Sequence, residues 1–391
     1  MSGWATRGVG VILIEDGPFG QPALFDGAEA LIAARTADEV APALAQLDGA
    51  RAQGKWVAGY ISYEAGYALE PKLAALMPAP DAARPLLVFG VFSGPGDPAK
   101  VLAAAKAEAR GVAVATLEPV ISRADYGAAI DRVMAYIAAG DCYQINLTFP
   151  LRTRLLHGAA LGLYGALRAR QAVGHGAYVD LGVGPVLVSR SPELFLRTTA
   201  AGRIEARPMK GTAPRDADPV RDAELAEALR GSAKDQAENL MIVDLLRNDI
   251  SRVAKVGSVK VPELFAVEHY ATVHQMVSRV VGQLVEAPTL AGLMPALFPC
   301  GSITGAPKIR AMQIIHEVEP FPRGVYCGAV GWMAPDGASS FNVAIRTLSV
   351  FADGAIELNV GGGVVQDSTP DGEWEEALWK ARYLQGLVRQ V

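Results

Sequence analysis

Strand-like segments follow one another in this chain without regular alternation with helices, and this order constrains the fold most. A doubly wound βαβ fold would place a helix after nearly every strand. The sequence therefore predicts an α+β fold with largely antiparallel sheets. The predicted strands are Val9–Ile14, Trp56–Ser62, Tyr143–Leu151, Gly176–Leu181, Pro185–Ser189, Leu194–Thr199, Ser258–Val261, Thr272–Leu284, Gly324–Met333, Phe341–Phe351 and Ala355–Val360.

Helical segments are fewer and carry ordinary start signals. The segment Ser122-Arg-Ala-Asp125 has the pattern of a capping box, with Asp in place of Glu. The predicted helices are Asp38–Leu47, Ala99–Arg110, Ser122–Ala139, Pro219–Leu229, Ala233–Arg247 and Gly372–Arg389. We interpret Leu117–Val120 as a linker between an N-terminal portion, residues 1–115, and a second portion, residues 122–391.

Composition excludes several classes of protein. The net charge of −5 argues against a nucleic-acid or membrane-surface partner. Cys142, Cys300 and Cys327 lie far apart, so they suggest neither a disulfide framework nor a zinc site. The apolar run Val9–Ile14 is too short for a signal-peptide core, and no segment has the length of a membrane span. We therefore expect a soluble cytoplasmic protein.

Two pairs of carboxylates have the spacing needed to share one helix face. Asp235 and Glu238 are three residues apart in one predicted helix, and Glu373 and Glu376 have the same spacing in another. Converging helices would then offer Mg²⁺ the oxygen ligands that it prefers. Solvated acidic faces near helix N-termini have the same spacing. The spacing alone leaves both interpretations open.

Two glycine-containing segments and one lysine are candidates for an anion site. Gly361–Gly363 follows a predicted strand, where it could present backbone N–H groups to an anion or form a tight turn. Gly301–Lys308 precedes a helix but lacks the spacing of a phosphate-binding loop. Lys210 lies in a turn-like segment; a buried lysine can act as a nucleophile, whereas most lysines beside glycine are exposed turn residues.

These segments together resemble the chorismate-utilising enzymes, which include the anthranilate, aminodeoxychorismate, isochorismate and salicylate synthases. The resemblance extends in order from about Ser122 to Leu387. It implies two antiparallel sheets packed face to face, helices outside, a site in a cleft, and terminal portions that form one intertwined unit. The matching segments are Ser191–Glu193, Arg207–Thr212, Lys234–Asp249, Gly301–Lys308, Gly328–Gly331, Ala344–Thr347, Val360–Val364 and Glu373–Arg382, and Gly59–Gly66 is similar to the N-terminal part of aminodeoxychorismate synthases.

The resemblance also implies roles for individual residues. It assigns Mg²⁺ binding to Glu238 and Glu376, with Asp235 and Glu373 as supporting carboxylates. It assigns catalytic roles to Lys210, Glu193 and Thr212. It assigns substrate binding to Arg346, Tyr326, the backbone of Gly362 and Gly363, Lys380, Gln144, His274 and Thr304.

Within the family, two positions favour the aminodeoxychorismate synthases, component I. Anthranilate synthases resemble Pro-Ile-Ala-Gly-Thr where this chain has Lys210. A lysine there can add to C2 of chorismate as the C4 hydroxyl leaves, after which ammonia attacks C4 and expels the lysine. Isochorismate and salicylate synthases carry a lysine base for water where this chain has Gln144, and glutamine cannot accept a proton at neutral pH. Glu193 matches the acid that would protonate the leaving hydroxyl.

One position departs from the family pattern. Anthranilate synthases have a histidine where this chain aligns Gln275, and a shift of one residue would place His274 there instead. That histidine is associated with pyruvate loss, so its displacement fits an enzyme that stops before the ring becomes aromatic.

The resemblance also implies partners and leaves alternatives. No cysteine has the pattern of a glutaminase nucleophile, so we expect ammonia to come from a separate glutamine amidotransferase subunit, and the product to reach a separate lyase on the route to 4-aminobenzoate and folate. Anthranilate synthase component I is the alternative activity, and Lys210 argues against it. A non-catalytic regulatory subunit, with an effector pocket in residues 1–115, is an alternative of another class.

Overall fold

The computed structural model describes residues 10–270 and 273–389, which form two large antiparallel sheets. Every strand pairing in the first sheet is antiparallel. Its strands lie in the order β16 (Gly305–Ala306), β8 (Gln144–His157), β20 (Ala355–Val364), β19 (Thr347–Val350), β10 (Val186–Ser189), β9 (Ala177–Asp180), β1 (Val11–Ile14) and β2 (Ala23–Asp26), and β6 (Ala113–Val114) and β7 (Glu118–Pro119) pair with β8.

The second sheet is also antiparallel and contains strands from both ends of the chain. Its order is β13 (Met209–Pro214), β15 (Val273–Gln283), β12 (Arg203–Arg207), β11 (Leu194–Thr198), β18 (Ser339–Asn342), β17 (Ala329–Met333), β4 (Trp56–Ile61), β5 (Leu87–Phe92) and β3 (Ala30–Ala34), with β14 (Lys260–His269) also paired to β15. The predicted α+β class with antiparallel sheets is therefore confirmed.

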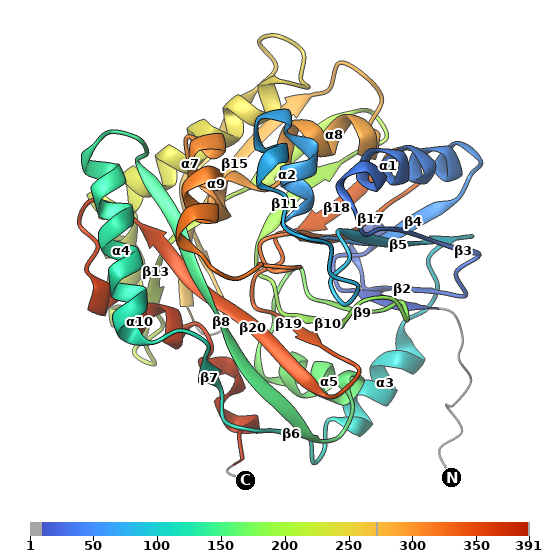
Figure 1. The fold of residues 1–391 in the computed structure, drawn as a ribbon, viewed down its shortest axis with the longest axis horizontal. Coiled ribbons are helices and arrows are strands. Elements are labelled where there is room, and N and C mark those ends of the chain that lie inside the picture. The colour runs from blue at the N-terminus through green and yellow to red at the C-terminus, as the bar shows by residue number, and fades with distance from the viewer. Residues whose placement is uncertain (1–9, 271–272, 390–391) are drawn as a thin grey trace.

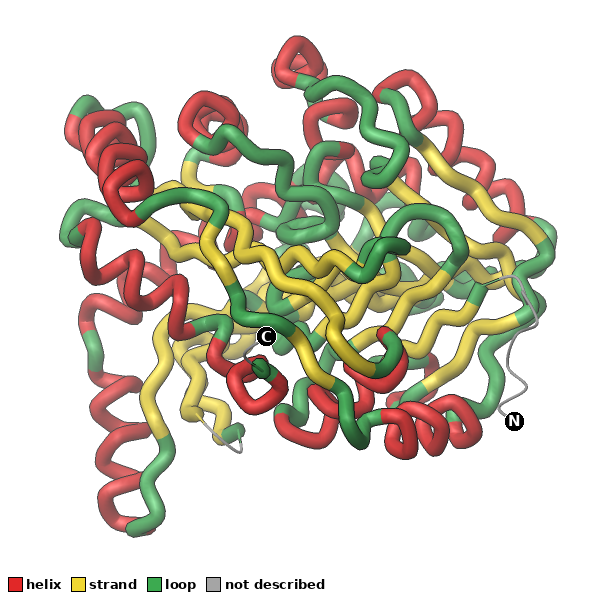
Figure 2. The backbone as a smooth tube through the Cα atoms, turned by 60° about the horizontal axis from the view of Figure 1, so that its bottom comes forward, coloured by secondary structure: helices red, strands yellow, loops and turns green. Residues whose placement is uncertain are grey.

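Helices cover the outer faces of the sheets (Figure 1 and Figure 2). In Figure 1, α1, α2, α7 and α8 lie above the strands, and α3 and α5 lie below them. The helices are α1 (Ala37–Ala52), α2 (Ala65–Leu69), α3 (Ala99–Glu108), α4 (Arg123–Ala138), α5 (Ala160–Arg170), α6 (Pro219–Gly231), α7 (Ala233–Ser251), α8 (Leu290–Leu297), α9 (Lys308–Val318) and α10 (Pro370–Trp379), with short 3₁₀ helices η1 (Pro18–Gly20), η2 (Pro71–Leu76), η3 (Gly301–Ile303) and η4 (Arg382–Leu387). Within the described ranges, no helix combines the length and apolar composition needed to cross a membrane.

Apolar side chains form layers between the sheets and under the helices. Phe25 and Leu187 of the first sheet pack with Tyr60 and Val330 of the second, so the two sheets are packed face to face. A second layer lies between the second sheet and helices that include α1 and α8, and a third lies between the first sheet and helices that include α4 and α5. Burial of these faces is the main favourable term for such an arrangement.

The predicted strand Phe341–Phe351 is wrong in one important respect, because it consists of β18 and β19, which belong to different sheets. Arg346 lies between them with a φ of 50°, a left-handed conformation that an extended strand cannot contain. The chain therefore crosses from one sheet to the other at Arg346. Apolar residues alternate on both sides of the crossing, at Phe341, Val343 and Ile345 before it and at Leu348 and Val350 after it, a pattern that is also typical of one strand.

Other boundaries also differ from the prediction. The triplet Gly361–Gly363 lies inside β20, paired with Thr148, Leu147 and Asn146, and does not form a turn. The predicted linker contains β7, because Glu118 and Pro119 pair with β8. The predicted strand Gly324–Met333 begins only at Ala329, after positive φ angles at Gly324 and Cys327.

The helix predictions are mostly confirmed. Ser122 caps α4, where its Oγ accepts a hydrogen bond from the Asp125 amide at 3.1 Å. The predicted helix Gly372–Arg389 is shorter, because α10 ends at Trp379 and η4 follows. The sequence reasoning assigned no helix to α5, whose Gly162 and Gly165 made it a weak helix signal. Val9 and Thr272, the first residues of two predicted strands, lie outside the described residues.

Candidate active site

Gly362 and Gly363 in β20 let charged and polar side chains approach the strand closely. A Cβ atom on Gly362 would lie 2.6 Å from Glu373 Oε2 and 3.5 Å from Lys380 Nζ. A Cβ atom on Gly363 would lie 3.0 Å from Lys210 Nζ. Any larger residue would displace these groups, so here glycine is required by close approach. The two glycines therefore mark where several predicted site residues meet.

The amine of Lys210 has no ion-pair or hydrogen-bond partner among the described residues. Lys210 lies in β13, and its amine reaches the region of Gly363. Burial lowers the pKa of Lys210 below its usual range; Glu238 opposes this effect, while the nearby Lys380 adds to it. An amine in this setting is neutral more often than a surface lysine and is available as a nucleophile.

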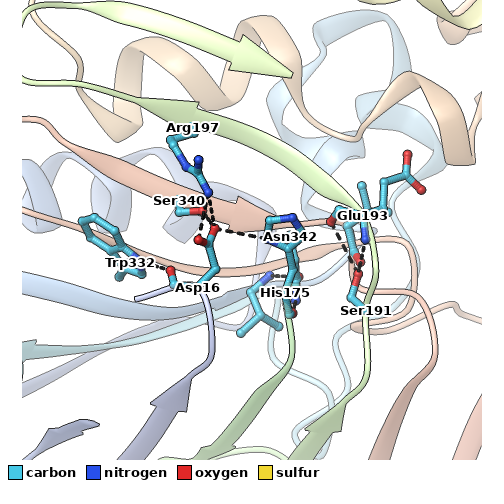
Figure 3. Close-up of polar contacts among 10 residues, drawn as sticks. Asp16, His175, Ser191, Glu193, Arg197, Trp332, Ser340 and Asn342 are labelled. Atoms are coloured by element: carbon cyan, nitrogen blue, oxygen red, sulfur yellow. Dashed lines mark hydrogen bonds and ion pairs between the residues drawn. The ribbon is translucent and has the colours of Figure 1, made fainter. Parts of the chain in front are cut away.

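Glu193 is almost completely buried, with 5% of its surface exposed, and it lies just before β11. Its amide donates to Ser191 Oγ at 3.2 Å, and Ser191 Oγ donates to the Val343 carbonyl at 2.6 Å (Figure 3). The Glu193 carboxyl points away from these backbone anchors in Figure 3 and accepts a hydrogen bond from Ser302 Oγ at 2.7 Å. Burial raises the pKa of Glu193 to about 7, against the opposing effects of Ser302, Lys210 and Arg346. The carboxyl can therefore be protonated near neutral pH.

The two pairs of carboxylates occur on α7 and α10, as predicted. Glu373 and Glu376 lie near Gly362, and Asp235 lies against Gly211, beside Lys210. Glu376 Oε1 is 2.8 Å from Lys380 Nζ, which also donates to the Gly361 carbonyl at 2.7 Å.

The charges of these carboxylates depend on one another. Burial opposes ionisation of Glu376, but Lys380 holds its pKa below the ordinary value. Burial raises the pKa of Glu238, with Lys210 opposing that shift and Glu376 reinforcing it. Burial also raises the pKa of Glu373. The two helices therefore present carboxylates that influence each other's ionisation.

The donor set is compatible with Mg²⁺ but does not form a complete protein cage. Among the residues that the structure describes, no three His, Cys, Asp or Glu side chains are grouped closely enough to hold a metal ion. Glu373 Oε1 accepts from Ser368 Oγ at 2.6 Å, and within the described ranges its buried Oε2 has no hydrogen-bond partner. Mg²⁺ usually keeps several waters and binds through one or two carboxylates plus substrate oxygens, which suits such a set.

Arg346 and Tyr326 lie at the junction between the two sheets. In the described part of the chain, the Arg346 guanidinium has no ion-pair partner, and burial lowers its pKa. Tyr326 is buried, and burial raises its pKa well above the usual range, so its hydroxyl stays protonated. The Cys327 amide donates to the Ala344 carbonyl at 3.0 Å, which joins the Tyr326 and Arg346 segments. A free guanidinium and a phenol suit the binding of a carboxylate.

Gln144 is fully buried, and neither polar atom of its amide has a hydrogen-bond partner among the residues that the structure describes. A Cβ atom on Gly363 would lie 3.0 Å from Gln144 Cδ, so the amide lies against the same glycine as Lys210. Leaving a buried polar group unsatisfied costs about 1–3 kcal/mol. The position of Gln144 is therefore more easily explained by a bound ligand or water than by folding alone.

Two predicted site residues, His274 and Thr212, form side-chain contacts within the fold. His274 is fully buried, with Nε2 2.9 Å from Asp222 Oδ1 and Nδ1 2.7 Å from His269 Nδ1. Thr212 donates to Gln275 Oε1 at 3.0 Å, and Gln275 donates to the Gly211 carbonyl at 2.7 Å. The contacts therefore join Gln275, rather than His274, to the Lys210 segment.

Two residues of the Gly301–Lys308 segment, Thr304 and Lys308, bond to other groups of the protein. Thr304 is fully buried, and its hydroxyl donates to carbonyls of Cys300 and Gly301 at 3.3 and 3.2 Å. Lys308 pairs with Asp249 at 2.6 Å, so its charge is neutralised. The segment contributes Ser302 to the site instead, a residue that the sequence reasoning included in a candidate anion site but did not single out.

A cavity of about 680 Å³ lies away from these residues. It is bounded by residues of the N-terminal portion, such as Tyr63 and Glu64, and by residues 315–323. The converging charges and the unsatisfied Gln144 amide identify the candidate active site better than cavity size does. The predicted effector pocket stays a prediction.

Comparison with known proteins identifies relatives. Residues 10–386 match the family model described as chorismate binding enzyme. Aminodeoxychorismate synthase component 1 of Klebsiella aerogenes is 45% identical over 260 residues, 66% of this chain and 57% of that protein. Anthranilate synthase component 1 of Thermus thermophilus is 44% identical over 271 residues, 69% of this chain and 58% of that protein. The chain thus spans little more than half the length of these relatives.

Solved structures show the same fold at low identity. Anthranilate synthase component I from Streptococcus pneumoniae superposes with a TM-score of 0.74 at 22% identity, covering 98% of this chain and 94% of that chain. The menaquinone-specific isochorismate synthase from Escherichia coli gives a TM-score of 0.74 at 18% identity, covering 98% and 90%. Since these proteins are named for different reactions, the likeness establishes the architecture and leaves the reaction to the site residues.

Proposed function

Because the chain belongs to the family of chorismate binding enzymes, we propose that it replaces the C4 hydroxyl of chorismate with an amine, forming 4-amino-4-deoxychorismate. Relatives named aminodeoxychorismate synthase and anthranilate synthase have similar identities to this chain, so identity does not select between the two reactions. The single observation that carries the proposal is the unpaired Lys210 amine beside Gly363 and Gln144.

In the first step, the Lys210 nitrogen adds to C2 of chorismate. A C–N bond forms, the two conjugated ring double bonds shift, and the C4–O bond breaks. Glu193 donates its proton to the departing oxygen, which leaves as water. The pKa of about 7 supports this role, because a protonated carboxyl remains available near neutral pH.

In the second step, ammonia attacks C4, the two ring double bonds shift back, and the C2–N bond breaks, which releases Lys210 as a neutral amine. The incoming nitrogen loses one proton, which restores the proton that Glu193 gave up in the first step. The net reaction consumes chorismate and ammonia and yields the amino product and water. Two successive displacements put nitrogen para to the ring carboxylate, whereas direct addition of ammonia at C2 would give the ortho product.

We assign Mg²⁺ binding to Glu238 and Glu376, with Asp235 and Glu373 in support. A bound Mg²⁺ would neutralise a substrate carboxylate and orient the ring. The free Arg346 guanidinium and the Tyr326 hydroxyl would bind the other carboxylate, and Gln144 would donate through its amide. The ammonia would come from a separate glutamine amidotransferase subunit, and the product would feed 4-aminobenzoate and folate synthesis.

The experiment that tests this proposal is a product assay. The purified chain is incubated with chorismate, Mg²⁺ and ammonium, and the products are separated and identified by mass. A product that an added lyase converts to 4-aminobenzoate supports amination at C4. Anthranilate with pyruvate would instead assign the chain to the ortho reaction and remove the nucleophilic role of Lys210. Absence of turnover with tight binding of a small effector would favour a regulatory subunit.

A further inference from the structure

A row of three buried side chains ends at the Glu193 carboxyl. Ser302 Oγ donates to Glu193 Oε1 at 2.7 Å, and Cys300 Sγ is 3.2 Å from Ser302 Oγ. Cys300, Ser302 and Glu193 are 3, 4 and 5% exposed. Solvent therefore cannot easily replace any of these contacts, and the geometry of the carboxyl depends on them.

The number of protons in this row restricts where the Glu193 proton can be. A serine hydroxyl has one hydrogen, and here it is directed to Oε1. In a neutral carboxyl, one oxygen carries the hydrogen and the other accepts hydrogen bonds. Since Oε1 accepts the bond from Ser302, the hydrogen of the Glu193 carboxyl belongs on Oε2. Burial raises the pKa of Cys300 to about 12, so the thiol keeps its hydrogen and can donate it to Ser302 Oγ. When the thiol donates to Ser302 Oγ, the serine hydrogen is directed to Glu193.

The backbone around Ser302 is anchored at both sides of the hydroxyl. The Ile303 carbonyl accepts from Arg323 Nη1 at 3.0 Å, and the Thr304 hydroxyl donates to the Gly301 carbonyl at 3.2 Å. Arg323 is itself held by Glu319 at 2.7 Å. The backbone that carries the Ser302 hydroxyl is therefore held in place on both sides. A residue that orients another side chain needs such a fixed backbone.

We propose that Ser302, oriented by Cys300, is a positioning residue that keeps the proton of the catalytic acid on Glu193 Oε2 and directs it at the departing hydroxyl. The inference rests on the proposed function, in which Glu193 is the acid. Ser302 touches no reacting atom in this scheme. The Ser302 hydrogen bond disfavours the state of Glu193 in which the carboxyl proton is on Oε1 and faces the protein interior.

The first test separates kcat from KM in Ser302→Ala. We expect kcat to fall by about tenfold to a hundredfold, a fraction of the contribution of a general acid, with little change in KM for chorismate. Loss of a hydrogen bond that favours the ionised carboxyl should also move the alkaline limb of the kcat profile to higher pH. Cys300→Ser, which keeps a donor at this place, should retain more activity than Cys300→Ala.

Ser339→Ala is the matched control, because it removes a fully buried hydroxyl whose partner is Thr198 at 2.6 Å. It should alter neither kcat nor the alkaline limb. If Ser302→Ala behaves like Ser339→Ala in both respects while the wild-type chain makes the amino product, the positioning role is overturned. If Ser302→Ala does not fold, the two Cys300 variants carry the test, and equal kcat values in these two variants overturn the role of the thiol.

A second measurement does not depend on turnover. The carboxyl carbon of Glu193 is followed by NMR with labelled glutamate and assigned by its absence in Glu193→Gln. In Ser302→Ala the pKa of Glu193 should rise by about half a unit to one unit, the value of one hydrogen bond. An unchanged pKa would contradict the inference. Failure of the product assay with a shifted pKa would instead reject the proposed function and leave the hydrogen-bonded row in place.

Discussion

At the scale of residues, the candidate site contains three polar groups that have no partner among the described residues. The Lys210 amine, the Gln144 amide and Glu373 Oε2 are unsatisfied among the described residues, yet they lie around two adjacent glycines. Folding normally pairs buried polar groups. Their convergence is the arrangement expected where a polar ligand or ordered water binds.

Lys210→Ala should abolish formation of the amino product while leaving chorismate binding nearly unchanged. The alanine removes the nucleophile, whereas the groups assigned to the carboxylates remain. Product analysis measures the first effect, and calorimetric titration with chorismate measures the second. Lys255→Ala, at an exposed lysine, is the control. Wild-type turnover in Lys210→Ala would exclude a covalent lysine intermediate.

Glu193→Gln should change the pH dependence of stability. Burial raises the pKa of Glu193 from 4.5 to about 7, so the folded chain holds this proton more tightly than the unfolded chain does. The associated stability is complete below pH 4.5 and is lost as the pH rises through 7. Glutamine cannot ionise, so the variant should gain about 3 kcal/mol relative to wild type between pH 4.5 and pH 8.

Denaturant unfolding at both pH values measures this gain. Glu375→Gln, which replaces an exposed glutamate paired with Arg123, should show the same difference from wild type at each pH. If Glu193→Gln also shows a constant difference, Glu193 is ionised in the folded chain across this range.

At the scale of elements, α7 and α10 bring two carboxylate pairs to the glycine end of β20. Each pair shares a helix face because of its spacing, but the convergence of the two faces depends on packing. Lys380 forms an ion pair with Glu376 and donates a hydrogen bond to the Gly361 carbonyl. Any cation that binds Glu376 must therefore compete with Lys380.

Glu238→Gln and Glu376→Gln should each weaken Mg²⁺ dependence at this helix pair. We expect the Mg²⁺ concentration for half-maximal activity to rise at least about tenfold, because each variant removes one charged ligand. Calorimetric titration with Mg²⁺ gives a readout that is independent of turnover. Glu375→Gln, on the same helix but paired with Arg123, should behave as wild type. A wild-type Mg²⁺ response in Glu376→Gln would remove it from the ligand set.

At the scale of the whole molecule, the N-terminal strands are shared between the two sheets. β4 pairs with β17 in the second sheet, and β1 pairs with β9 in the first. Asp16, just after β1, accepts hydrogen bonds from Arg197 of β11 at 2.7 Å and Ser340 of β18 at 2.5 Å (Figure 3). Glu193 immediately precedes β11, so the N-terminal portion supports the element that carries the acid.

Asp16→Ala should destabilise the whole chain by about 1–3 kcal/mol, because it leaves the buried Ser340 hydroxyl without its acceptor. Burial opposes ionisation of Asp16, but His175, Ser340 and Arg197 hold its pKa well below the ordinary value, so this stability should disappear in strong acid. Differential scanning calorimetry should show one transition at a lower temperature. Asp26→Ala, at an exposed position in β2, is the control. Two separate transitions would show that the portions unfold independently.

Several features of the candidate site could be predicted from the sequence because they depend on local order. The i, i+3 carboxylates of α7 and α10 follow from helix geometry, and Lys210 was chosen from its motif. Ser302 and the unsatisfied state of Gln144 could not be predicted, since both depend on contacts between segments far apart in the chain. The roles of His274 and Thr304 remain predictions, although their side chains bond elsewhere.

By itself the sequence determined the α+β class and most helices, and it led to the prediction that Lys210 and Gln144 distinguish amination at C4 from related reactions. Periodicity and motifs are properties of short segments, so they can be recognised without knowledge of the fold. Only the tertiary structure decided that Phe341–Phe351 divides between two sheets at Arg346 and that Gly361–Gly363 lies within β20. It also decided the burial that raises the pKa of Glu193 to about 7, because desolvation is produced by distant segments packing around a side chain.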